Sequence, residues 1–206
     1  MIFIKKTIVR IEISVLIAVL IANMFSFAGF SKQCDEIRNK VLRMHVIANS
    51  DEDVDQKLKL KVRDAVLNEG RELFDGSLTA DDAEEKIVPN INRLEDVALR
   101  TIKENGFDYD VEIYVAKEYF KTRVYENSVT LPAGEYTAVK VVIGEGDGQN
   151  WWCVMFPPMC LPAANNDAKM EDVLNKEEME IVSNSEKYSF RFKIVEICKE
   201  MIKKIK

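Results

Sequence analysis

The 206-residue sequence offers little that would serve catalysis. It has one histidine, His45, and it contains no GxSxG turn, no HExxH helix and no glycine-rich phosphate loop. Its four cysteines form no CxxC pair and, together with one histidine, follow no zinc-ligand spacing. These absences exclude the motif-bearing serine hydrolases, zinc proteases and P-loop enzymes. We therefore expect no metal ion and no cofactor.

The chain also lacks an excess of positive charge and has no internal repeat. Setting aside three basic and one acidic residue among the first 30 leaves 26 basic and 34 acidic side chains, a net charge of −8. A surface of this sign is repelled by nucleic-acid phosphates and by anionic lipid headgroups. We expect no nucleic-acid partner, and the charge argues against adhesion to anionic lipid.

The first 30 residues differ from the rest. Lys5, Lys6 and Arg10 precede an apolar run over residues 13–30, the pattern of a segment directed to a membrane. Two interpretations stay open. The small residues around Ala28 fit cleavage of a signal peptide, whereas the length of the run also allows a retained anchor.

Either interpretation places residues 31–206 outside the cytoplasm as a single extracytoplasmic domain, because the basic flank precedes the apolar run. All four cysteines lie in this part, where oxidising conditions favour disulfides. We expect a Cys153–Cys160 bond across a Pro-Pro turn, with Cys34 and Cys198 then joining the two ends. Four free, buried thiols are the alternative.

Hydrophobic periodicity predicts an α+β domain, a mostly antiparallel sheet with helices packed on it. A strand over 41–48 precedes a helix that reaches about Phe74, with Ser50 and Asp53 as its capping box. A second helical stretch, broken at Pro89, ends near Gly106. Alternating strands are expected at 109–115 and 120–124, followed by a hairpin of strands 135–143 and 149–156. Residues 162–186 are expected to form a polar insert with a short helix near 176–182. A final helix over 191–205 is expected to bury Ile194, Ile197, Cys198, Met201 and Ile202.

The segment GQNWWCVMFPPMC, residues 148–160, has an unusual composition. Trp151 and Trp152 are neighbours on a predicted strand, so their rings point to opposite faces of the sheet. An exposed tryptophan beside the rigid Pro157-Pro158 pair resembles a protein-contact anchor. Burial of both rings under helices is the alternative.

A catalytic site built from a cysteine and His45 is weakly supported. No lysine, arginine or predicted helix start lies near Cys153 or Cys160 to lower a thiol pKa. A histidine in the middle of a strand is more typical of a structural role. Asp51, Asp53 and their neighbours lack the glycine and glutamate positions of an EF-hand, so they indicate a solvated helix start.

Two blocks of sequence resemble a known family. LRMHVIANSD with DQKLKLKVRDAVL, and GEYTAVKVVIGEGDGQNWWCVMFPPMC, are similar to the stage II sporulation protein R family of endospore-forming bacteria; the resemblance covers 41–160 and the FRFKIVE start of the last helix. The resemblance implies a signal rather than an enzyme. It implies a protein made in the forespore and exported to the space between the forespore and mother-cell membranes. There it would activate a membrane-embedded aspartic protease that processes the sigma-E precursor.

The same resemblance suggests which residues meet that protease. The candidate contact residues are His45, Asn49, Ser50, Asp51, Trp151, Trp152, Phe156, Pro157 and Pro158. Lys61, Arg63, Asp64, Cys153 and Cys160 also match the family blocks, whereas residues 162–186 match nothing in them. Two other function classes stay open: an exported cysteine hydrolase or thiol-redox enzyme that uses Cys153 or Cys160 with His45, and a structural envelope protein held by an uncleaved helix.

Overall fold

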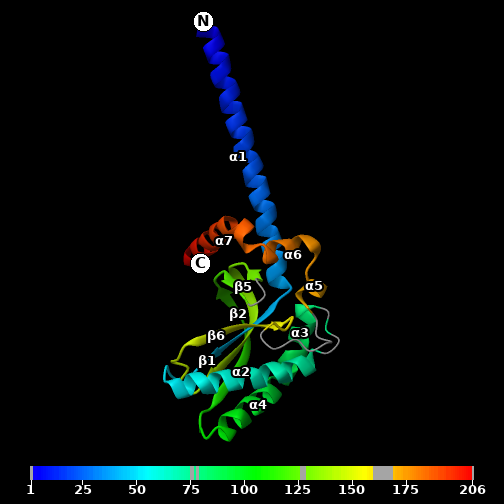
Figure 1. The fold of residues 1–206 in the computed structure, drawn as a ribbon, viewed down its shortest axis with the longest axis vertical. Helices are drawn as coiled ribbons and strands as arrows, with labels where there is room; N and C mark the ends of the chain where they lie inside the picture. Colours follow the sequence, from blue (N-terminus) through cyan, green and yellow to red (C-terminus); the bar gives the residue numbers. More distant parts are fainter. Residues whose placement is uncertain (1, 75–76, 78, 126–128, 160–168, 206) are drawn as a thin grey trace.

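A computed structural model describes residues 2–74, 77, 79–125, 129–159 and 169–205. A long N-terminal helix, α1 (Ile2–Asn39), projects from an α+β domain (Figure 1). The segment Arg10–Asn39 is long and apolar enough to cross a membrane, and 6% of its most apolar window is buried. The expected fold class and the N-terminal apolar helix are both confirmed.

The end of α1 belongs to the domain. Phe30, Cys34 and Ile37 are buried, whereas Met24 and Phe25 are 72% and 75% exposed. One uninterrupted helix therefore passes from an exposed apolar stretch into a folded core. The domain boundary expected between residues 30 and 31 stays a prediction.

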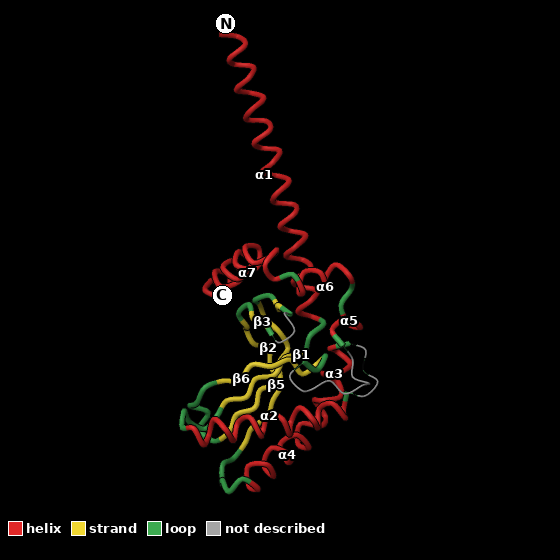
Figure 2. Tube along the Cα trace, in the orientation of Figure 1, coloured by secondary structure: helices red, strands yellow, loops and turns green. Residues whose placement is uncertain are grey.

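A four-stranded mixed sheet forms the centre of the domain, in the order β2-β5-β1-β6 (Figure 2). Its strands are β1 (Leu42–Ile47), β2 (Val111–Phe120), β5 (Gly134–Ile143) and β6 (Asn150–Phe156). The β2–β5 and β1–β6 pairs are antiparallel, and β1 runs parallel to β5. Strands 109–115 and 120–124 were expected; the structure instead has one ten-residue strand, β2, followed by a short β3 (Arg123–Val124) that pairs with β4 (Thr130–Leu131).

The predicted hairpin of residues 135–143 and 149–156 is wrong. Both strands exist, but β1 lies between them and pairs with each. The physical reason is that β1 is buried on both faces, as its burial pattern shows, and such a strand is stable only in the middle of a sheet.

One face of the sheet packs against α2 (Asp53–Leu73) and α4 (Ile91–Glu104), and α3 (Ala80–Ile87) and the 3₁₀ turn η1 (Val88–Asn90) lie between these two helices in the chain. Pro89 lies in η1, as expected from its place between two helices. The predicted capping box is wrong, because Glu52 is the N-cap of α2 and makes no side-chain cap bond. The core on this face includes Met44, Val46, Leu58, Val62, Val66, Leu94, Ala98, Val139, Val141 and Cys153.

A second core lies where α1 meets the C-terminal helices α5 (Met170–Val173), α6 (Lys176–Ser183) and α7 (Ser185–Ile205). Helix α6 agrees with the short helix expected near residues 176–182, and residues 160–168 lie outside the described part. The buried face predicted for α7 is wrong. Phe192 and Val195 are buried, whereas Ile197, Met201 and Ile202 are 45–55% exposed. The helix has apolar residues on two sides, and the side with Phe192 and Val195 packs inward.

Candidate functional site

A lateral row of four side chains crosses the face of the sheet opposite α2 and α4. Tyr114 of β2 pairs with Lys140 of β5, which pairs with His45 of β1, which pairs with Trp152 of β6. Tyr114, Lys140 and Trp152 are partly exposed, whereas His45 is 3% exposed. Glu118, Val142 and Ile47, also partly exposed, lie on the same face. We call these seven residues the open face.

His45 lies at the centre of the row. Its ring stacks on that of Trp152, with centroids 5.0 Å apart and planes at 9°, and meets Phe120 edge-on at 6.0 Å. Neither ring nitrogen has a hydrogen-bond partner among the described residues. Burial lowers the pKa of His45 to about 4, so the ring is neutral at pH 7. This is a packed aromatic ring rather than a base poised beside a nucleophile.

The charges on the open face are paired. Lys140 lies 3.4 Å from a Glu118 carboxylate oxygen and 5.5 Å from the centroid of the Tyr114 ring. Arg123 lies 5.8 Å from the Trp152 ring. A surface of this kind suits contact with another protein, because the aromatic rings supply apolar area to bury and the paired charges orient the partner.

Below the row, Arg43 is completely buried among aromatic rings. Its guanidinium carbon lies 3.9 Å from the Phe120 centroid and 4.7 Å from that of Tyr136, and it donates a hydrogen bond to the Tyr125 hydroxyl. The motif LRMHVI thus places alternate polar residues, Arg43 and His45, in one aromatic cluster. The sequence predicted the strand but gave no sign of this cluster, because the aromatic rings around Arg43 and His45 come from other segments of the chain.

Asn49, Ser50 and Asp51 form a different site, at the end of the sheet. The buried carboxylate of Asp55 accepts hydrogen bonds from Asn49 Nδ2 at 2.9 Å, Ser50 Oγ at 2.6 Å and Tyr109 Oη at 3.1 Å. Burial opposes ionisation, but these bonds outweigh it and hold the pKa of Asp55 below its usual value.

Asn49 and Asp51 also fasten the β5–β6 loop. Asn49 Oδ1 accepts from the Glu145 amide at 3.1 Å, and Asp51 Oδ1 accepts from the Gln149 amide at 2.8 Å. The Gly148 amide donates to the Ala48 carbonyl at 2.9 Å. We call this network around Asp55 the loop clamp; its geometry explains Asn49, Ser50 and Asp51 as structural residues.

The remaining candidates separate again. Trp151 is 38% exposed on the α2 side of the sheet, where the Arg63 guanidinium lies 4.6 Å from its ring. Phe156 is 1% exposed and meets the Phe74 ring edge-on at 5.9 Å. Pro157 follows it through a cis peptide bond and is also buried. Pro158 is partly exposed. Of the nine predicted contact residues, the open face thus brings together only His45 and Trp152.

Cys153 is disulfide-bonded and lies in the core under α2, on the face opposite His45. Cys160 lies outside the described residues, so the Cys153–Cys160 pairing stays a prediction. The expected Cys34–Cys198 bond is wrong, because both are free thiols. Cys34 is buried in the α1 core, where it packs instead of bonding. A catalytic pair of Cys153 and His45 is incompatible with their placement on opposite faces.

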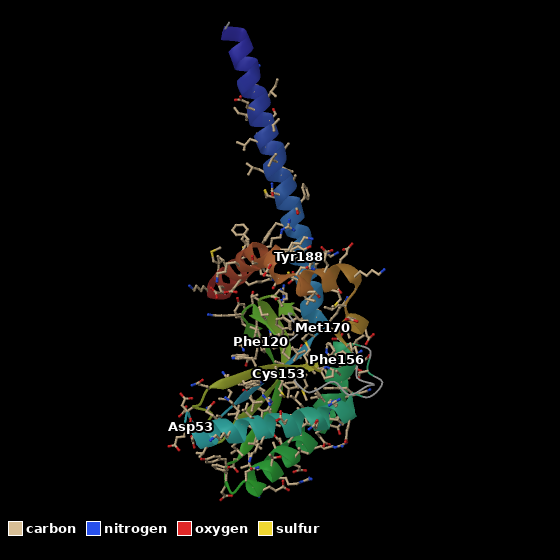
Figure 3. All side chains as sticks on the ribbon, viewed as in Figure 1. Asp53, Phe120, Cys153, Phe156, Met170 and Tyr188 are labelled. Carbon is tan, nitrogen blue, oxygen red and sulfur yellow. The ribbon has the colours of Figure 1, made fainter. Side chains whose placement is uncertain are left out.

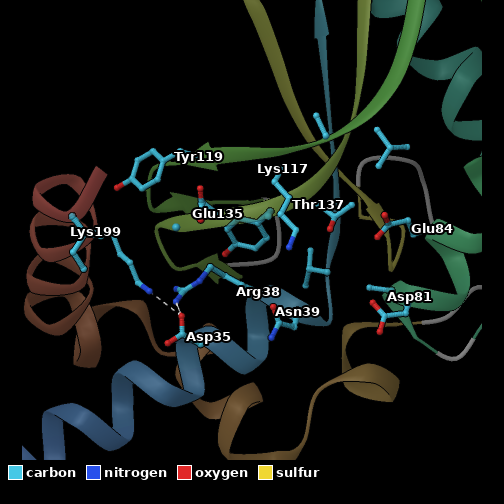
Figure 4. Close-up of a pocket in the computed structure, with 17 residues that line it drawn as sticks. Asp35, Arg38, Asn39, Asp81, Glu84, Lys117, Tyr119, Glu135, Thr137 and Lys199 are labelled. Atoms are coloured by element: carbon cyan, nitrogen blue, oxygen red, sulfur yellow. Dashed lines mark hydrogen bonds and ion pairs between the residues drawn. The ribbon is translucent and has the colours of Figure 1, made fainter. Parts of the chain in front are cut away.

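A cleft of about 1030 Å³ opens between α1, α3, α7 and the β2–β5 ribbon (Figure 4). Lys199 Nζ lies 3.0 Å from Asp35 Oδ1, and Arg38 pairs with the same carboxylate. Asp81, Glu84, Lys117 and Glu135 add charges of both signs. These residues come from five separate segments, so no sequence motif could reveal the cleft. Its mixed charges select no single class of ligand.

Among the residues that the structure describes, no group of three or more histidine, cysteine or acidic side chains is arranged to hold a metal ion.

Comparison with known proteins gives a consistent result. The family model for stage II sporulation protein R matches residues 38–166. Stage II sporulation protein R of Bacillus subtilis (strain 168) is 35% identical over 141 residues, which cover 68% of this chain and 62% of the relative. The chain thus spans less than two thirds of the length of this curated relative. No solved structure matches the chain.

Proposed function

Because this chain belongs to the stage II sporulation protein R family, we propose that it is an exported sporulation signal rather than an enzyme. It is made in the forespore, crosses the membrane by means of α1 and acts in the space between the forespore and mother-cell membranes. There it activates a membrane-embedded aspartic protease of the mother cell, which then processes the sigma-E precursor. The family match is the observation that carries this proposal.

The site geometry supports a binding role. The only histidine is a buried, neutral ring stacked between aromatics, and Cys153 is already bonded and faces away from it. The open face offers what a contact surface needs: partly exposed rings of Tyr114 and Trp152, and an ion pair between Lys140 and Glu118 beside them. We therefore assign the protease contact to the open face.

Reconstitution in a non-sporulating bacterium tests this assignment. The chain, the protease and the sigma-E precursor are co-expressed, and cleavage of the precursor is followed by immunoblot. Trp152→Ala and Tyr114→Ala remove rings from the open face, and Trp151→Ala is the matched control on the other face. We expect the first two to lower cleavage by about tenfold or more, as loss of an interface anchor does. The control should retain cleavage.

Two outcomes separate the parts of the proposal. Full activity of Trp152→Ala and Tyr114→Ala at normal exported levels would show that the open face is not the contact. Cleavage that does not depend on the wild-type chain, with all three proteins present, would reject the signalling role itself.

A further inference from the structure

Helix α7 has a second apolar side that nothing in the described part of the chain covers. Phe190, Ile194, Ile197 and Met201 follow the spacing i, i+4, i+7, i+11, so they form one stripe along the helix. Phe190 is 76% exposed, Met201 55% and Ile197 45%, and Ile194 is partly exposed. The opposite side of α7 packs inward through Phe192 and Val195. The stripe is therefore a surface and not a misplaced part of the core.

The position of α7 identifies what this surface can meet. Tyr188 stacks on Phe30 of α1 at 5.5 Å, Phe192 meets the same ring edge-on at 5.5 Å, and Arg191 donates to Ser26 Oγ at 3.3 Å. These contacts fix α7 at the point where the exposed apolar length of α1 ends. In Figure 1, α7 lies crosswise at the foot of α1. In Figure 3, side chains of α7 extend toward the side on which α1 projects.

The charge of α7 differs from that of the domain. The helix has six basic and three acidic side chains, a net charge of +3, whereas the exported part as a whole has −8. Lys187 and Lys193, on either side of the stripe, have side chains that are 60% and 64% exposed, and they form ion pairs with Glu180 and Glu196. The argument from total charge against adhesion to anionic lipid therefore does not hold for this helix.

We infer that α7 is an interfacial helix, which lays its Phe190–Met201 stripe into the outer leaflet of the membrane that α1 enters. A helix with an apolar stripe and basic flanks, held crosswise at the end of a membrane-spanning helix, matches the physical requirements for lying in a bilayer surface. The occupant of the stripe is lipid. This inference does not depend on activation of a protease.

Depth-dependent quenching tests the inference on the full chain reconstituted into phosphatidylglycerol–phosphatidylcholine vesicles. Each of two variants, Phe190→Trp and Ile197→Trp, carries one additional tryptophan. Val54→Trp is the control, since Val54 is an apolar residue 51% exposed on a different helix, α2. Wild type supplies the background of Trp151 and Trp152. The measurement compares emission with and without lipids brominated on the acyl chains, and it does not depend on the orientation of the chain across the vesicle wall.

We expect brominated lipid to quench the tryptophans at positions 190 and 197 severalfold more than the one at position 54, together with a blue shift of their emission. Equal quenching at all three positions would overturn the inference. A blue shift without bromine quenching that disappears on dilution into more lipid would identify a second copy of the chain as the occupant, and would also overturn it. Circular dichroism of each variant shows whether the fold is kept.

Discussion

His45 and Trp152 are cross-strand partners whose rings stack at 5.0 Å, so the only histidine of the chain titrates inside an aromatic cluster. Burial holds the pKa of His45 at about 4 in the folded state, against 6.5 for an ordinary histidine. Between pH 6.5 and pH 4, His45 is therefore protonated in the unfolded chain and neutral in the folded chain. The contribution to stability is complete above pH 6.5 and is lost as the pH falls toward 4.

Replacing this ring should flatten that pH dependence. His45→Phe keeps an aromatic ring in the stack and removes the titration. Between pH 7 and pH 4.5 we expect wild type to lose on the order of 2–3 kcal/mol more of its free energy of unfolding than the variant does. Urea denaturation in detergent at the two pH values measures the difference. Parallel curves for the two proteins would show that His45 is not the cause.

Asp55→Asn should weaken the loop clamp. The carboxylate is 3% exposed and accepts hydrogen bonds from Asn49, Ser50 and Tyr109, and an amide cannot accept all three. We expect the free energy of unfolding to fall by about 2 kcal/mol, as for loss of buried hydrogen bonds to a charge. Asp53→Asn, at an exposed position in the first turn of α2, is the control and should change stability by less than about 1 kcal/mol. A similar loss in both variants would contradict the assigned role.

Gly148→Ala should damage the same region through the backbone. A Cβ at this position would press against the backbone carbonyl of Ser50, which cannot move without breaking the clamp. We expect a loss of about 2 kcal/mol or more in a denaturant titration. Gly70→Ala is the matched comparison, because its added Cβ would crowd only the flexible end of Met155 and would lie in ordinary contact with the Phe74 ring. There the gain in helix propensity, about 1 kcal/mol, offsets the crowding; an equally large loss at both glycines would refute the argument.

The cysteines can be counted by labelling. Denatured, unreduced protein should take up alkylating reagent at two positions, Cys34 and Cys198, because these are the free thiols. Reduction should raise the count to all four cysteines of the chain. Intact mass gives the count, and a peptide map of the unreduced protein tests whether Cys153 is joined to Cys160. Label at Cys153 before reduction would disprove the bond.

The strands and helices of the two blocks that match the family could be predicted from the sequence because each has a recognisable hydrophobic pattern. Residues 41–48, 53–74, 135–143 and 149–156 all have the expected structure. Their pairing could not be read in the same way. Because β5 and β6 are adjacent in the sequence, we expected them to form a hairpin. In the structure β1, which is buried on both faces, lies between β5 and β6 and pairs with each. Hydrophobic periodicity describes one element at a time and does not indicate which strand pairs with it.

The candidate site shows the same limit. His45 and Trp152 were among the nine candidate contact residues, and nothing in the local sequence distinguished them from Phe156, which is in the core, or Asn49, which holds a loop. Tyr114 and Lys140 were missed because each is ordinary within its own strand. Only the register of four strands makes them neighbours of His45. The inner side of α7 was also misassigned, since both of its sides are apolar.

The continuity of α1 determines how the domain can move. Because its last turns are part of the core, the described chain has no slack between the apolar segment and the sheet. While that segment stays in the bilayer, the domain is held rigidly at the membrane surface. It can diffuse laterally and rotate about the membrane normal, but it cannot leave the membrane. A cut after Ala28 would remove this tether and leave only the inferred lipid contact of α7 to hold the domain at the membrane. The state of that one peptide bond therefore sets whether the domain is fixed to the bilayer by a spanning helix or held there by a reversible surface contact.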